Sequence, residues 1–130
     1  MSDSKAVPEG IKLHSRSREL ELNYRAGEQY RLSCEFLRVH SPSAEVRGHG
    51  QGQETLQTGK LEVAITEIKP VGNYALQLVF DDGHDTGIYS WDYLYHLCRN
   101  REQMWQDYLQ RLAAAGGVRD PEVQVLRLDP

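Results

Sequence analysis

The sequence contains little cysteine, no excess of basic residues and no long apolar run, and each shortage excludes a class of protein. Its two cysteines, Cys34 and Cys98, are too few for a disulfide scaffold. No stretch approaches the roughly 20 apolar residues that a membrane span requires, and residues 1–20 lack the apolar segment of a secretory signal. We therefore expect a cytoplasmic protein with reduced thiols and no membrane partner.

The charge balance excludes a further class of partner. Lysine and arginine together number 15 against 19 aspartate and glutamate residues, which gives a formal net charge of −4 and a pI near 5.7. A dedicated nucleic-acid-binding domain usually carries an excess of basic side chains. The composition therefore predicts that nucleic acid is not a partner of this protein.

What the chain does contain is sufficient for one folded domain. Its 130 residues are 39% hydrophobic and 26% charged, as in ordinary globular proteins, and a chain of this length buries roughly two-thirds of its unfolded surface. Residues 1–10 are mostly polar or small and predict a flexible N-terminus. We expect the domain to span residues 11–117, followed by a C-terminal tail over residues 118–130 that contains two prolines.

The order of the hydrophobic patterns indicates the fold class. Apolar residues follow the period of a strand at 11–14, 20–24, 30–32, 61–68, 76–80 and 85–89. They then recur at helical spacing over 91–97, after the capping residue Ser90, and over 104–112, before Gly116 and Gly117 end the second helix. Strands followed by helices predict a single α+β domain, in which one antiparallel sheet of about five to six strands carries two C-terminal helices on one face.

The middle of the chain interrupts these patterns. Residues 34–39 predict one helical turn or a bend, and residues 40–59 have almost no apolar periodicity and contain four glycines. Most connections in compact domains have about 4–6 residues, so a loop of about twenty is either functional or mobile. Its Gly48–Gln53 stretch is superficially like a phosphate-binding loop, but no helix pattern follows it, which favours a merely flexible loop.

Candidate binding residues surround this loop. Arg38, His40, Arg47 and His49, together with Lys60, can form a modest site for an anion or a protein partner. Glutamates are interleaved with these residues and nearly cancel their charge, so a solvated surface is the alternative interpretation.

Two tyrosines of the first predicted helix are further binding candidates. Tyr93 and Tyr95 lie on other faces of that helix than Trp91, which we expect in the core. Exposed tyrosines suit a protein interface and are equally compatible with an ordinary surface. Both interpretations of these tyrosines therefore stay open at this point.

Histidine and cysteine offer an alternative, metal-binding interpretation. The set that the chain can bring to zinc or iron is His84, His40, His49 and Cys34. No C-x-x-C or H-x-x-x-H pair nucleates such a site, and His84 can instead pair with the carboxylate of Asp81 across a tight turn. Cys34 lies in no recognisable thiol-enzyme motif, which favours a small buried core residue over a nucleophile.

Two segments resemble a known family. Residues 36–50 read FLRVHSPSAEVRGHG and residues 80–94 read FDDGHDTGIYSWDYL. Together they are similar to the family named for the N-terminal domain of gamma-butyrobetaine hydroxylase, here as a stand-alone bacterial domain of unknown function. The resemblance covers approximately residues 11–115. In the hydroxylases this module precedes an iron- and 2-oxoglutarate-dependent catalytic domain, binds a structural zinc ion and is implicated in subunit association.

The resemblance also places the zinc ligands of those hydroxylases on this chain. Their three cysteines fall on Ser41, Ser43 and approximately Val46, and their histidine falls on His84. Hydroxyl groups and a valine side chain do not replace thiolates as ligands of zinc, so we expect no such site unless His40 or His49 substitutes. The 130 residues also leave no room for the catalytic domain, and we expect no oxygenase activity.

The combined expectation is a small non-catalytic module that binds another protein and has no cofactor of its own. The same module resembles the C-terminal appendage of some P-loop ATPases that carry iron–sulfur clusters, which implies an accessory role in iron–sulfur or metal-dependent protein systems. The alternative is a zinc or iron protein that uses His84. Weak self-association stays open, and an enzymatic function rests on nothing beyond the presence of titratable residues.

Overall fold

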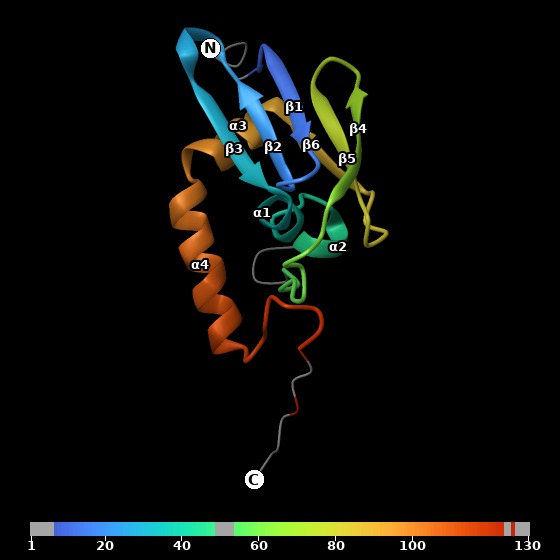
Figure 1. The fold of residues 1–130 in the computed structure, drawn as a ribbon, viewed down its shortest axis with the longest axis vertical. Coiled ribbons are helices and arrows are strands. Elements are labelled where there is room, and N and C mark those ends of the chain that lie inside the picture. The colour runs from blue at the N-terminus through green and yellow to red at the C-terminus, as the bar shows by residue number, and fades with distance from the viewer. Residues whose placement is uncertain (1–6, 49–53, 124–125, 127–130) are drawn as a thin grey trace.

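A computed structural model describes residues 7–48, 54–123 and 126, and it has an α+β architecture (Figure 1). The strands are β1 (Gly10–His14), β2 (Glu19–Asn23), β3 (Gln29–Ser33), β4 (Ile65–Val71), β5 (Ala75–Phe80) and β6 (Gly87–Ser90). The α-helices are α1 (Cys34–Val39), α2 (Ala44–Arg47), α3 (Trp91–Arg99) and α4 (Arg101–Ala114), and a 3₁₀ turn, η2, lies at Arg25–Gly27. The α+β class predicted from the order of the patterns is confirmed.

The first sheet has the strand order β1-β2-β3 and is antiparallel. Leu20 pairs with Leu32 and Leu22 pairs with Tyr30 across the predicted hairpin, so the alternating apolar residues lie on one face. Both leucines of β2 are fully buried. Ala26 adopts a positive φ of 64° in the turn, ahead of Gly27 at 82°, which reverses the chain between β2 and β3.

The second sheet, β4-β5-β6, is also antiparallel, and it corrects one detail of the prediction. The sequence predicts one sheet of five to six strands, whereas the described strands form two sheets of three. The buried α1 helix follows β3 directly, and among the described residues strand pairing resumes only at β4. Residues from both sheets, such as Leu22 and Leu78, nevertheless share one hydrophobic core.

The two C-terminal helices have different positions. Ser90 caps the N-terminus of helix α3, where its hydroxyl accepts a hydrogen bond from the Tyr93 N–H. The helix buries Leu94 and Leu97 in the shared core. Helix α4 instead extends away from the sheets (Figure 1). Its Tyr108 packs in a second cluster with Leu112 and with Val39 of α1. The prediction that both helices cover one face of a sheet is therefore correct for α3 and is not met by most of α4.

The chain beyond α4 contacts the loop that precedes β4. The Gly59 and Leu61 N–H groups donate hydrogen bonds to the carbonyls of Val118 and Arg119. The Arg119 guanidinium also makes two 2.8 Å hydrogen bonds to the carboxylate of Glu35, which is buried in α1. The first residues of the predicted tail are thus held against the domain. No helix in the described ranges is both long and apolar enough to cross a membrane.

Candidate functional site

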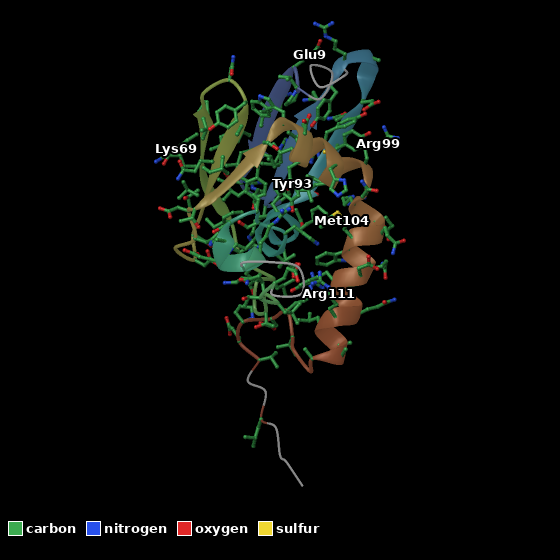
Figure 2. The ribbon with its side chains drawn as sticks, turned by 180° about the vertical axis from the view of Figure 1, so that it is seen from behind. Glu9, Lys69, Tyr93, Arg99, Met104 and Arg111 are labelled. Atoms are coloured by element: carbon green, nitrogen blue, oxygen red, sulfur yellow. The ribbon has the colours of Figure 1, made fainter. Side chains whose placement is uncertain are left out.

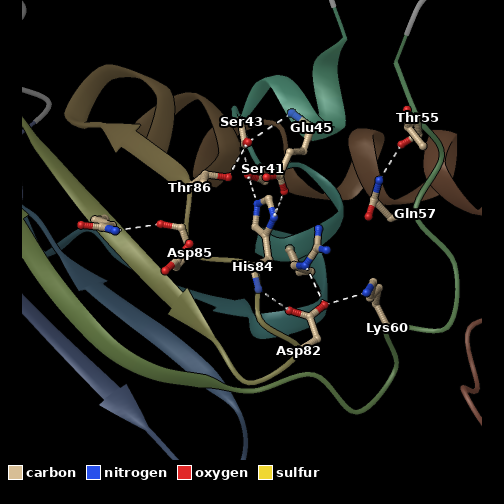
Figure 3. Close-up of polar contacts among 12 residues, drawn as sticks. Ser41, Ser43, Glu45, Thr55, Gln57, Lys60, Asp82, His84, Asp85 and Thr86 are labelled. Carbon is tan, nitrogen blue, oxygen red and sulfur yellow. Dashed lines mark hydrogen bonds and ion pairs between the residues drawn. The ribbon is translucent and has the colours of Figure 1, made fainter.

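Two clusters of polar side chains meet at the connection between α1 and α2. The first, which we call the polar network, consists of Ser41, Ser43, Glu45, His84 and Thr86 (Figure 3). The second, which we call the cleft, is a cavity of about 100 Å³ whose charged and ring-bearing lining residues are His40, Arg47, Glu54, Tyr93, Tyr108 and Arg111. Ser41 of the network also borders this cavity.

The hydrogen bonds of the polar network are satisfied in one consistent arrangement. His84 Nδ1 lies 3.1 Å from Glu45 Oε1, and because a carboxylate only accepts, the proton of a neutral imidazole is on Nδ1. His84 Nε2 therefore accepts from the Ser41 hydroxyl at 2.8 Å, and the Ser41 oxygen in turn accepts from the Ser43 N–H at 3.2 Å. The hydroxyls of Ser43 and Thr86 are 2.7 Å apart. The network joins the α1–α2 connection to the turn between β5 and β6.

Burial keeps the imidazole of this network neutral. Only 5% of His84 and 1% of Ser41 are exposed. Burial and the charge of Arg38 lower the pKa of His84, and they outweigh the opposite influence of Glu45. The sequence predicts that His84 pairs with Asp81, and this prediction is wrong. The His84 ring contacts Glu45, and the Asp81 carboxylate accepts a hydrogen bond from the Ala64 N–H.

The order serine, histidine, glutamate has the connectivity of a catalytic triad, but its surroundings do not suit a nucleophile. A serine that attacks a substrate must be reached by the substrate carbonyl. Ser41 is only 1% exposed, and a methyl group placed on Gly87 would lie 2.6 Å from its hydroxyl oxygen, so Gly87 closes one side of this hydroxyl. The arrangement is therefore suited to linking two segments of the fold.

The residues of the network also do not fit the zinc site that the family resemblance implies. The structure brings Ser41, Ser43 and His84 together, so these predicted ligand positions converge, but two of them carry hydroxyls. The Nε2 lone pair of His84 is engaged by Ser41 and is not free for a metal. Within the described ranges, no three His, Cys, Asp or Glu side chains gather into a metal-binding group.

The alternative metal set of the sequence analysis is not assembled by the described residues. Cys34 is buried at the start of α1, where burial raises the pKa of its thiol and disfavours the thiolate that a metal requires. His40 lies at the other end of the same helix and turns its Nδ1 to the Phe36 carbonyl, 2.9 Å away. His49 lies outside the residues that the structure describes.

Two of the basic residues predicted around the loop are already paired. The same Oδ2 atom of Asp82 accepts hydrogen bonds from Arg38 Nε at 2.9 Å and Lys60 Nζ at 2.6 Å (Figure 3). Burial alone would raise the pKa of Asp82, but these cations and the His84 N–H outweigh it and hold the pKa below its usual value. Arg38 therefore belongs to the neighbourhood of the polar network, and it does not line the cleft.

Three of the predicted binding residues meet at the cleft. His40 directly follows α1, Arg47 is the last residue of α2 and Tyr93 belongs to α3, and all three line the same cavity. The guanidinium carbon of Arg47 lies 5.0 Å from the centroid of the Tyr93 ring, which is within the range of a cation–π contact. The Tyr93 hydroxyl donates to the His40 carbonyl at 2.6 Å and ties α3 to the end of α1.

Helix α4 forms one side of the cleft, and the sequence did not predict its contribution. Tyr108 and Arg111 are three residues apart and share one face of α4, and the Tyr108 hydroxyl donates to the Gln57 carbonyl at 2.7 Å. Figure 2 labels Arg111 on this helix and Tyr93 on α3. The sequence pattern assigns Tyr108 to an apolar stripe, and no local signal shows that this stripe faces residues 54–57.

The electrostatics of the cleft differ from those of the network. Burial and the charge of Arg111 lower the pKa of His40, which favours the neutral ring. Neither Arg47 nor Arg111 forms an ion pair with a carboxylate in the described part of the chain. The cleft thus holds two guanidinium groups that are exposed and available to an external anion.

Tyr95 is separated from these residues. Its hydroxyl donates to Glu28 at 2.9 Å, and its ring packs edge-on against Tyr24 at 5.0 Å between centroids, beside the first sheet. Tyr93 and Tyr95 therefore do not form one surface. Whether either of them contacts a partner stays a prediction.

Comparison with known proteins places the chain in a family. Residues 11–95 match the family model described as "Gamma-butyrobetaine hydroxylase-like, N-terminal". Two proteins with NMR solution structures are 52% and 49% identical to this chain, with TM-scores of 0.79 and 0.75; the alignments cover 94% and 100% of this chain and 96% and 99% of theirs.

A crystal structure provides a third relative. It is a protein of unknown function from Acidithiobacillus ferrooxidans, of the DUF971 family, with 38% identity and a TM-score of 0.57 over 74% of this chain and 97% of that one. No curated protein matches the chain. The family resemblance predicted from residues 36–50 and 80–94 is confirmed, and the chain belongs to the gamma-butyrobetaine hydroxylase-like N-terminal domain family.

Proposed function

We propose that this protein is a non-catalytic binding module that uses the cleft to contact another protein. It acts without a metal of its own, and its partners belong to iron–sulfur or other metal-dependent protein systems. The association with such systems rests on the resemblance to modules that accompany iron–sulfur ATPases and hydroxylases. The use of the cleft rests on the geometry of the described residues.

One observation carries the choice of the cleft. Arg47 and Arg111 line it from different helices, and neither has a carboxylate partner in the described residues, whereas Arg38 and Arg119 are each bound to a carboxylate of the chain. A guanidinium group that is exposed and held near an aromatic ring is a frequent anchor of protein interfaces. These two arginines are the reason that we choose the cleft as the binding surface.

A non-catalytic role agrees with the chemistry of the buried groups. The Ser41 hydroxyl is buried and engaged with His84, and the Cys34 thiol is buried with a raised pKa, so neither is presented as a nucleophile. His40 and His84 are not free to act as bases at Nδ1, because each donates its Nδ1 proton to an acceptor of the chain itself.

Site-specific crosslinking in a lysate of the host organism tests the proposal. A photo-crosslinking residue replaces Thr55 at the cleft, and the matched control carries it at the exposed Lys12 of β1. We expect a protein to be captured from position 55 and not from position 12. The yield should fall in the Arg47→Glu/Arg111→Glu variant.

A second variant controls for the change in net charge. Arg16→Glu/Arg25→Glu changes two exposed arginines beside the first sheet, and it should leave the captured protein and its yield unchanged. Equal capture from positions 55 and 12, or capture that both double variants reduce alike, would contradict the proposed use of the cleft.

A further inference from the structure

We propose that the group received by the cleft is a carboxylate, supplied by an acidic side chain of the partner protein and held by Arg47 and Arg111. This inference rests on the proposed function and adds the chemical class of the group that is recognised. It follows from the charge of the cleft, from the donors that remain available in it and from its size.

The charge of the cleft matches a single negative charge. Two arginines and Glu54 line it, and the neutral ring of His40 contributes no charge, so the lining carries one net positive charge within a protein of net charge −4. A monoanion neutralises this charge. A phosphate with close to two charges at neutral pH leaves an excess of negative charge beside Glu54.

The available hydrogen-bond donors also favour a carboxylate. The hydroxyl protons of Tyr93 and Tyr108 are committed to the carbonyls of His40 and Gln57, and the Nδ1 proton of His40 is committed to Phe36. The side-chain donors left in the cleft with full charge are the two guanidinium groups. Their planar forks match the two oxygens of a carboxylate in bidentate geometry.

The size and walls of the cleft suit a short acidic side chain. A cavity of about 100 Å³ has room for a carboxylate and its neighbouring methylene group. The rings of Tyr93 and Tyr108 and the side chain of Leu56 provide apolar surface for the methylene group. Arg47 already lies over the Tyr93 ring, so part of its ordering precedes binding.

The test is a titration of the full-length ¹⁵N-labelled protein followed by amide NMR shifts. The probe is N-acetylglutamate N-methylamide, and its glutamine analogue is a neutral probe of nearly the same shape. We expect saturable shifts at the amides of Arg47, Thr55 and Leu56 with the glutamate probe and none with the glutamine probe. Arg47→Gln and Arg111→Gln should each weaken binding tenfold or more, because each removes a charge-assisted pair.

Matched controls make the outcome decisive. The Arg16→Gln/Arg25→Gln variant removes two positive charges away from the cleft and should bind the glutamate probe like the unchanged protein. Equal shifts with both probes, unchanged affinity in the Arg47 and Arg111 variants, or tighter binding of inorganic phosphate at the same amides would each overturn the carboxylate assignment.

The same experiments separate this inference from the function on which it rests. If crosslinking at position 55 captures a partner in a manner that depends on Arg47 and Arg111 while the glutamate probe does not bind, the carboxylate assignment fails and the proposed function stands. If the probe binds as expected but position 55 captures no partner, the proposed function fails and the carboxylate site stands.

Discussion

The polar network and the cleft start from neighbouring residues and have opposite properties. Ser41 turns into a buried network, in which each hydrogen of the His84–Ser41 pair has an acceptor. His40 turns to the cleft, where two guanidinium groups have no carboxylate partner among the described residues. Buried polar groups contribute to a fold when they are satisfied, and charged groups remain available for recognition when they are exposed and unpaired. We therefore assign stability to the network and recognition to the cleft.

Removing the centre of the network should have the largest effect on stability. His84→Ala leaves the buried Ser41 hydroxyl without its acceptor and opens a cavity, and we expect it to reduce the free energy of unfolding by about 2–3 kcal/mol. Urea unfolding measures this loss. His96→Ala, at an exposed position of α3, is the control and should change the free energy of unfolding by less than about 0.5 kcal/mol. Equal losses in both variants would show that the network is not a structural link.

Acidification should weaken the folded state through the same histidine. The pKa of His84 is lowered in the folded protein, so below pH ~6.5 the unfolded chain takes up a proton that the folded protein does not. The free energy of unfolding should therefore fall as the pH drops below this value, by at most about 1.4 kcal/mol per pH unit for one histidine. Unfolding titrations between pH 7.5 and 5.5 measure the slope.

A histidine variant isolates this contribution from other groups. His84→Gln removes the titrating ring, and its unfolding free energy should depend less steeply on pH than that of the unchanged protein. A slope that is the same in the two proteins would mean that His84 is not held neutral by its burial.

Neutralising the cleft should change stability much less than the loss of the His84 side chain. Arg47→Gln/Arg111→Gln alters exposed side chains without carboxylate partners in the described residues, and we expect a change of less than about 0.5 kcal/mol in the free energy of unfolding. The same variant should lose binding of the glutamate probe. Substantial destabilisation, measured by urea unfolding, would place these arginines among the structural residues.

Addition of zinc should have no effect on the thermal midpoint of the unchanged protein. The imidazole of His84 has no free lone pair, and the two converging family positions, Ser41 and Ser43, supply hydroxyls. Thermal unfolding of protein prepared without an affinity tag, with zinc or with a chelator, measures the midpoint. A zinc-dependent rise, or stoichiometric zinc in the purified protein, would favour the metal-binding alternative.

The local parts of this structure are predictable from sequence, and the long-range parts are not. The alternation around Leu20 and Leu22 and the helical spacing after Ser90 are short-range signals, and the hairpin and α3 follow from them. Periodicity shows which face of a strand is apolar and not which strands pair. For this reason the division into two sheets and the position of α4 were not predicted.

The candidate site was likewise predictable from the sequence only in part. The grouping of His40, Arg47 and Tyr93 is within reach of the sequence, because two of these residues border the irregular loop. The contact between Ser41 and His84 joins residues 43 positions apart, and Arg111 reaches the cleft only because α4 packs on residues 54–57. Such contacts depend on tertiary packing, which no local pattern encodes.

The most direct test of the separation between network and cleft is the affinity of the glutamate probe for two variants measured side by side. His84→Ala damages the network at a residue that does not line the cleft, whereas Arg47→Gln/Arg111→Gln damages the cleft. We predict that the His84 variant, although less stable, binds the probe like the unchanged protein and that the double arginine variant does not bind it. Loss of binding in the His84 variant, or retained binding in the arginine variant, would contradict the separate roles assigned to these two regions.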